Sequence, residues 1–179
     1  WNVSDEDGWL YGYAAWQKIA EEAAAKSDEE LVTAMRAFAN EAIRYGITSV
    51  QSMPIIDADR LARLQAQVNV PLRWRWIDFR LGTVETSPDR AVKYILDGTP
   101  IERGAALSEP YADRPSERGT FRYTDEQIAE IVNVAAQSPH QLLVHAVGDA
   151  AIGKLFTAMA RTGIDWTEKR VRLEHGDEI

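Results

Sequence analysis

The feature of this sequence that most constrains its fold is a repeated alternation of short strand-like runs with longer helical segments from residue 47 onward. Strand-like runs lie at 47–52, 72–79, 91–96, 141–147 and 170–175. Helical patterns at 57–67, 124–137 and 149–162 lie between them. Because no two consecutive strands are joined by a two-residue turn, the pattern predicts an α/β fold with a parallel sheet and right-handed crossovers.

Local signals fix where several of the helices begin and end. A helix is predicted over 9–45, where alanine and other helix formers dominate, with a break at Ser27. Ser27 with Glu30, and Thr124 with Gln127, have the spacing of capping boxes at two helix starts. Gly46 is predicted to end the first helical region.

Composition excludes several classes of protein. The chain has 179 residues, no cysteine and a net charge of -8, so disulfides and cysteine-ligated zinc are excluded and binding to nucleic acid is disfavoured. No apolar run is long enough for a membrane span, and no signal peptide is visible, so we expect a cytoplasmic protein. Residues 1–179 are predicted to form a single α/β domain. A start at Trp1 and an end just after a strand-like run are typical of an excised piece of a longer protein.

Five parallel strands occur in two architectures. One is a doubly wound sheet; the other is a segment of a (β/α)₈ TIM barrel, since a whole barrel needs at least about 200 residues. Periodicity alone leaves both open. In both architectures the functional residues lie at the carboxyl ends of the strands.

Three polar residues lie in or at the end of predicted strands. His145 and His175 are near the ends of their strands, on faces shared with apolar neighbours, and Lys93 lies within the strand at 91–96. Two histidines and a lysine on successive strands suggest a site for zinc or a similar divalent metal. The structural alternatives are buried, hydrogen-bonded histidines and a Lys93 that pairs with Asp97 or Glu174.

Several segments of the sequence carry a resemblance to a known family. They are Lys93–Gly98, Gly104–Leu107, Glu109–Asp113, His145–Asp149 and Arg172–His175, preceded by Gly46–Gln51. In this order they resemble amidohydrolase family 3, a branch of the metal-dependent amidohydrolase superfamily. The resemblance runs from Gly46 to Glu174, and it matches the middle five strands of the family's barrel, strands 2 to 6.

The resemblance implies a barrel with one or two divalent metal ions, of which zinc is the expected one. It also implies a metal-bound hydroxide that attacks the carbonyl carbon of a small-molecule amide, so that the C–N bond is cleaved. It assigns Lys93, His145 and His175 as catalytic, metal-ligating residues, with Lys93 carboxylated as a carbamate in many family members. The family's His-x-His pair is absent from this chain. We therefore expect an isolated chain with little activity, and exposed sheet edges that either self-associate or receive the missing barrel strands.

Other residues are interpreted more plainly. Asp97 is predicted to begin an Asp-Gly turn, and Asp149 to be a helix N-cap or an acceptor that orients His145. His140 receives no role. The segment 101–119 is a candidate lid or specificity loop.

Three competing functions are weighed against this one. The run 148–155 resembles a phosphate-binding loop, but Leu155 stands where a hydroxyl side chain is needed. The run 73–76 interleaves arginine with tryptophan, a pattern found on surfaces that bind nucleic acid, although strand alternation explains it more simply. A non-enzymatic α/β interaction or regulatory module, with structural histidines, is the third.

Overall fold

The computed structural model describes residues 2–3, 10–11, 13–79, 83–85 and 89–177. The chain divides into two compact units, Trp1–Ile77 and Asp78–Ile179. Whether residues 1–179 act as the single domain predicted from the sequence stays a prediction. The predicted α/β architecture with parallel strands is confirmed in both units.

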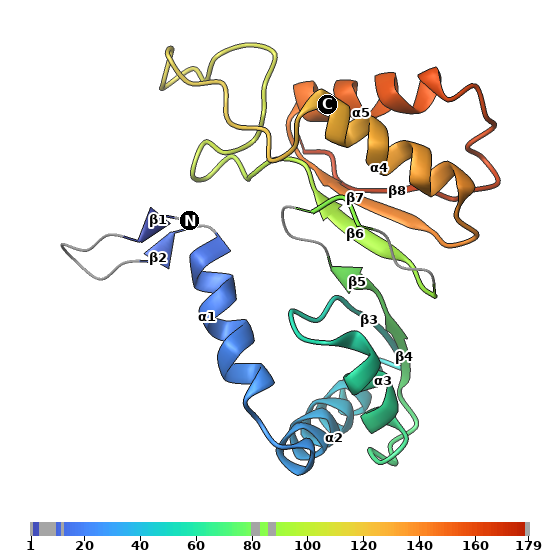
Figure 1. The fold of residues 1–179 in the computed structure, drawn as a ribbon. Helices are drawn as coiled ribbons and strands as arrows, with labels where there is room; N and C mark the ends of the chain where they lie inside the picture. Colours follow the sequence, from blue (N-terminus) through green and yellow to red (C-terminus); the bar gives the residue numbers. More distant parts are fainter. Residues whose placement is uncertain (1, 4–9, 12, 80–82, 86–88, 178–179) are drawn as a thin grey trace. The chain divides into compact units, whose positions relative to one another are not determined.

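The described residues of the first unit form an antiparallel pair of strands, three helices and a pair of parallel strands (Figure 1). In chain order these are β1 (Asn2–Val3), β2 (Leu10–Tyr11), α1 (Tyr13–Ala24), α2 (Asp28–Arg44), β3 (Ser49–Ser52), α3 (Ala58–Gln65) and β4 (Arg73–Trp76). Strand β3 pairs in parallel with β4, from Ser49 opposite Arg73 to Ser52 opposite Trp76. The sequence prediction missed the antiparallel pair β1–β2, whose second strand occupies the start of the helix predicted over 9–45. Residues 9 and 12 of that prediction lie outside the described residues.

Local capping and alternation explain most of this unit. The Ser27 side chain caps α2 and the Glu30 carboxylate accepts from the Ser27 amide, so the predicted capping box is confirmed. Trp74 and Trp76 are half-buried and stacked, with ring centroids 5.2 Å apart, whereas the arginines that alternate with them are exposed. Because the tryptophans pack on the core formed by α2, α3 and the segment before β4, alternation in a half-buried strand accounts for the arginine–tryptophan run.

In the second unit, the residues that the structure describes form a four-stranded parallel sheet and two helices. Its elements are β5 (Asp78–Phe79), β6 (Val92–Ile95), α4 (Asp125–Gln137), β7 (Leu142–Ala146), α5 (Asp149–Arg161) and β8 (Arg172–His175). The strand order β5-β6-β7-β8 follows the chain. The single strand predicted over 72–79 is wrong, because it is divided between β4 and β5, which belong to different sheets, around the fully buried Ile77.

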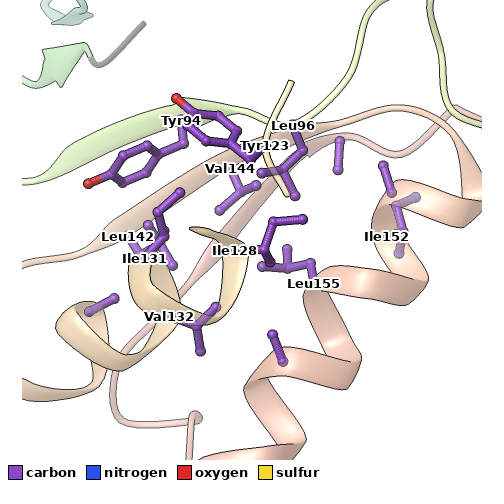
Figure 2. Packing of buried hydrophobic residues seen from close by; sticks show 14 of the residues in the cluster. Tyr94, Leu96, Tyr123, Ile128, Ile131, Val132, Leu142, Val144, Ile152 and Leu155 are labelled. Carbon is purple, nitrogen blue, oxygen red and sulfur yellow. The ribbon is translucent and has the colours of Figure 1, made fainter. Parts of the chain in front are cut away.

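One face of this sheet packs against α4 and α5. Figure 2 shows the apolar cluster there, in which Tyr94, Leu142 and Val144 from the strands meet Ile128, Ile131 and Leu155 from the helices. The capping box of Thr124 and Gln127 opens α4 as predicted. A helix on only one side of a parallel sheet leaves the opposite face for other side chains.

The register shows what lies on that opposite face. Lys93 pairs with Leu143, which pairs with Arg172, and His145 pairs with Glu174. Side chains on paired and alternate residues share a face, so these five residues project away from the helices. The face combines charged side chains with the buried Leu143.

In the described part of the chain, β3 pairs only with β4, and β8 pairs only with β7. Whether these edges recruit further strands, as the sequence predicts, stays a prediction. No helix among the described residues has the length and apolar character needed to span a membrane.

Candidate functional site

The three residues predicted as metal ligands come from three neighbouring strands. Lys93 lies on β6, His145 on β7 and His175 at the end of β8. Parallel pairing brings the carboxyl ends of these strands to one edge of the sheet. The two imidazole rings are in contact there, with centroids 4.5 Å apart and an angle of 65° between their planes. The two histidines therefore converge at the strand ends, whereas their role as metal ligands stays a prediction.

His145 is held in a buried position. Its residue is 8% exposed, and its Nε2 lies 3.3 Å from the carbonyl oxygen of Gly98 and 3.6 Å from Oδ1 of Asp97. Because a carbonyl oxygen only accepts, a neutral His145 donates through Nε2 and keeps the lone pair on Nδ1. Burial lowers the pKa of His145 most, opposed by the Gly98 carbonyl, and this favours the neutral ring that binds metal ions.

His175 reaches the site by a different route. Sequence alternation placed it on a buried face with Leu173, but this is wrong, because the residue is exposed. Its φ of 77° lies in the left-handed region, which few residues other than glycine adopt, so the alternation of β8 no longer sets the direction of its side chain. Such strained residues persist where the surrounding structure holds them, and they cluster at functional sites.

Lys93 is buried and ion-paired. Its Nζ contacts the carboxylate of Glu174, which also binds the guanidinium of Arg172. Burial lowers the pKa of Lys93, and the nearby positive charge of Arg172 lowers it further. Of the two structural partners that the sequence offered, Glu174 rather than Asp97 is the one used. The pairing does not decide whether Lys93 becomes a metal ligand, which stays a prediction.

Asp97 is the residue whose role the sequence understated. It is fully buried, and its carboxylate accepts hydrogen bonds from the backbone amides of Ala106, Val147 and Gly148 at 2.8–3.0 Å. These donors belong to two segments far apart in sequence, so the contacts extend well beyond a local Asp-Gly turn. Its position immediately after a strand on which a candidate ligand lies was the available signal.

Asp149 has neither of the two roles predicted for it. The N-cap of α5 is Gly148, and Asp149 is the first helical residue. Its carboxylate accepts from the amide of Ser108, at 2.9 Å, and from the Ser108 hydroxyl. These hydrogen bonds hold the pKa of Asp149 below its usual value and connect α5 to the segment after β6.

The predicted lid segment 101–119 is internally hydrogen-bonded. The amide of Leu107 donates to the carbonyl of Arg118 at 2.8 Å, and the Tyr111 hydroxyl donates to the carbonyl of Ala105 at 2.8 Å. Arg103 and Asp113 form an ion pair across it. A role of this segment as lid or specificity loop stays a prediction.

His140, for which the sequence suggested no role, lies before β7.

The phosphate-loop alternative is not supported by the geometry. Residues Asp149–Leu155 continue as helix, so the run never forms an open loop. The Gly148 amide already donates to Asp97, and Lys154 pairs with Asp125 while its Nζ lies 4.0 Å from the centroid of the Phe121 ring. The donors that a phosphate would need are therefore engaged elsewhere.

The imidazoles of His145 and His175 are suitable as two of the ligands of a divalent metal ion. Within the described part of the chain, no group of three or more His, Cys, Asp or Glu side chains is arranged to hold a metal ion. His145 and His175 meet at the strand ends, and a neutral His145 retains a lone pair, which suits zinc chemistry. Lys93 would add a third donor only as an anionic carbamate.

Comparisons with known proteins agree with this fold. The amidohydrolase family model matches residues 3–178. "Putative amidohydrolase YtcJ" of Bacillus subtilis (strain 168) is 35% identical over 71 residues, which are 40% of this chain and 13% of that protein.

Two solved structures, titled as uncharacterized metal-dependent hydrolases, share the fold. The one from Pyrococcus horikoshii OT3 gives a TM-score of 0.70 at 20% identity and covers 90% of this chain and 37% of its own. The one from Pyrococcus furiosus gives 0.69 at 20% identity, covering 90% of this chain and 38% of its own. The chain thus spans well under half the length of these relatives. Since the family model covers nearly all of its residues, the chain belongs to amidohydrolase family 3.

Proposed function

We propose that this chain is the middle part of the catalytic barrel of a metal-dependent hydrolase that cleaves amide-like C–N bonds in a small molecule. The observation that carries the proposal is the contact between the His145 and His175 rings at the carboxyl ends of β7 and β8. Family membership and the titles of the two solved relatives support hydrolytic chemistry and a metal cofactor.

The distribution of side chains in the second unit supports a barrel rather than a doubly wound sheet. A doubly wound sheet carries helices on both faces, whereas α4 and α5 pack on one face together with the apolar cluster. The other face carries Lys93, His145, Arg172 and Glu174. In a barrel, the face away from the helices is the interior, and the strand ends around it form the active site.

Each residue of the site has a separate task in this proposal. His145 and His175 would hold a divalent ion, zinc by preference for imidazole ligands, and a carboxylated Lys93 would supply an anionic oxygen. An ion held there would acidify water and polarise the carbonyl of the substrate. The hydrogen bond from Nε2 of His145 to Gly98 fixes the ring, and Glu174 holds the unmodified Lys93 in place until it reacts.

The chain supplies only part of such a ligand set. It has three histidines and no His-x-His pair, and it aligns with 37–38% of the solved relatives. A site with so few ligands binds its ion weakly. We therefore expect residues 1–179 alone to be nearly inactive and the protein encoded by the whole parent gene to be active.

The test is hydrolysis of a panel of small N-acyl amides by the two proteins, purified with zinc. We expect the longer protein to release amine, to lose this activity with a zinc chelator and to recover it when zinc is restored. The chain 1–179 should stay at the uncatalysed rate. Turnover that resists the chelator, or equal turnover by 1–179, contradicts the proposal.

A further inference from the structure

We infer that Asp97 is a positioning residue, which fixes the segment after β6 and the turn between β7 and α5 against each other and thereby sets the orientation of the His145 ring. The inference starts from the burial of its carboxylate, which is 0% exposed. A buried carboxylate is costly unless it is fully hydrogen-bonded or paired with charge. The hydrogen-bond donors that satisfy the Asp97 carboxylate therefore identify the segments that it holds in place.

The hydrogen bonds of Asp97 join two segments that are distant in sequence. Oδ2 accepts from the amide of Ala106 at 2.9 Å and from the amide of Gly148 at 2.8 Å, and Oδ1 accepts from the amide of Val147 at 3.0 Å. Ala106 belongs to the long connection between β6 and α4, and the other two follow β7 directly. One side chain thus ties the two segments together, in addition to the backbone hydrogen bond from the amide of Ala150 to the carbonyl of Ala106.

The same carboxylate borders the candidate ligand. Oδ1 lies 3.6 Å from Nε2 of His145, and the carbonyl of the next residue, Gly98, lies 3.3 Å from that nitrogen. Two oxygen atoms from consecutive residues therefore face one ring nitrogen. Because oxygen atoms only accept here, they favour a proton on Nε2 and so select the ring orientation in which Nε2 points toward them.

Close backbone contact leaves the two segments little room to move relative to each other. A Cβ atom on Gly148 would lie 2.0 Å from the carbonyl oxygen of Ala106, so the two segments touch without an intervening side chain. The amide of Ala150 also donates to that oxygen at 3.1 Å. A small shift of either segment would consequently move the Gly98 carbonyl and the His145 ring relative to each other.

Asp97→Asn tests the inference, because an amide has the same shape but only one acceptor oxygen. If that oxygen keeps the hydrogen bonds to Ala106 and Gly148, the side-chain amide nitrogen of the new asparagine faces the Val147 amide and Nε2 of His145. All three groups are donors, so the hydrogen bond to Val147 is lost and the side-chain amide repels the N–H of His145. Asp149→Asn is the matched control. It weakens another carboxylate tie between the same segment and α5, through Ser108, and the Asp149 carboxylate does not contact His145.

The readout is the pair of imidazole ¹⁵N signals of His145, recorded without metal at one pH and assigned with a His145→Gln variant. In Asp97→Asn we expect these signals to move and the Val147 amide to lose about tenfold or more of its protection from hydrogen exchange. In Asp149→Asn we expect the His145 signals to stay where they are. Unchanged His145 signals in a folded Asp97→Asn protein, or an equal shift in both variants, overturns the inference.

A measurement on the unmodified chain keeps the inference testable if Asp97→Asn fails to fold. The amides of Ala106, Val147 and Gly148 should exchange slowly and together, and the His145 ring should show a nuclear Overhauser contact with the Gly98 α-protons. Fast exchange at these amides, or absence of the contact, overturns the inference. The consequence for catalysis rests on the proposed function, but both measurements are made without metal, so a failure to bind zinc would leave them unaffected.

Discussion

Replacing Gly148 with alanine is expected to destabilise the second unit by about 3 kcal/mol, at the upper end of the cost of overpacking. The added Cβ would lie 2.0 Å from the carbonyl oxygen of Ala106 and 2.4 Å from its carbonyl carbon. Both are backbone atoms, so the clash cannot be relieved by rotating a flexible side chain. The φ of Gly148 is -75°, which any residue adopts, so the effect comes from the contact alone.

The matched control is Gly153→Ala in the interior of α5. Nothing lies within 4 Å of a Cβ atom added there, and the residue is helical, so alanine should stabilise the unit by roughly 0.5–1 kcal/mol. Urea unfolding followed by circular dichroism measures both variants. We expect Gly148→Ala to lower the free energy of unfolding and Gly153→Ala to raise it. Equal free energies of unfolding in the two variants would show that Gly148 does not approach Ala106 this closely.

Replacing Glu174 with glutamine is expected to cost about 3 kcal/mol, because removing one partner of a buried ion pair leaves the other charge uncompensated. The Lys93 and Glu174 side chains are 8% and 16% exposed, and Glu174 also binds Arg172. Without the carboxylate, the Lys93 ammonium and the Arg172 guanidinium face each other. Since burial already lowers the pKa of Lys93, loss of its proton sets the upper limit of this cost.

An exposed lysine–carboxylate pair in the same unit provides the comparison. Lys154 and Asp125 have side chains that are 37% and 65% exposed, so Asp125→Asn should cost less than about 1 kcal/mol. Both variants are measured by urea unfolding at the same pH and ionic strength. If Glu174→Gln costs no more than Asp125→Asn, the Lys93–Glu174 pair does not hold the inner face together.

The sequence predicted the elements that depend on neighbouring residues. Ser27 and Thr124 begin their helices because their hydroxyls accept hydrogen bonds from the backbone amides three residues ahead. These contacts are local, so they can be predicted without knowing the tertiary structure. Strands β6, β7 and β8 were also predictable, since each is short, contains apolar residues and is separated from the next by a helix or long connection. The division of 72–79 into β4 and β5 was not, because pairing partners rather than propensity decide which sheet a strand joins.

The candidate site shows the same division between local and distant information. The strand positions of Lys93 and His145 could be predicted from the pattern and from the family resemblance. The conformation of His175 could not, because a φ of 77° in a non-glycine residue depends on the surrounding structure. The role of Asp97 was missed because two of its three amide donors lie 50 and 51 residues away along the chain.

In the proposed site, His145 and His175 together bind a divalent metal ion. Zinc titration of the chain 1–179 by calorimetry tests it most directly, with His145→Gln, His175→Gln and the control His140→Gln. His175 is exposed, so its replacement should leave the fold intact and isolates the loss of a ligand. We expect weak, saturable binding that disappears in either site variant and persists in His140→Gln. Binding that survives both site replacements, or that His140→Gln abolishes as well, would contradict the claim.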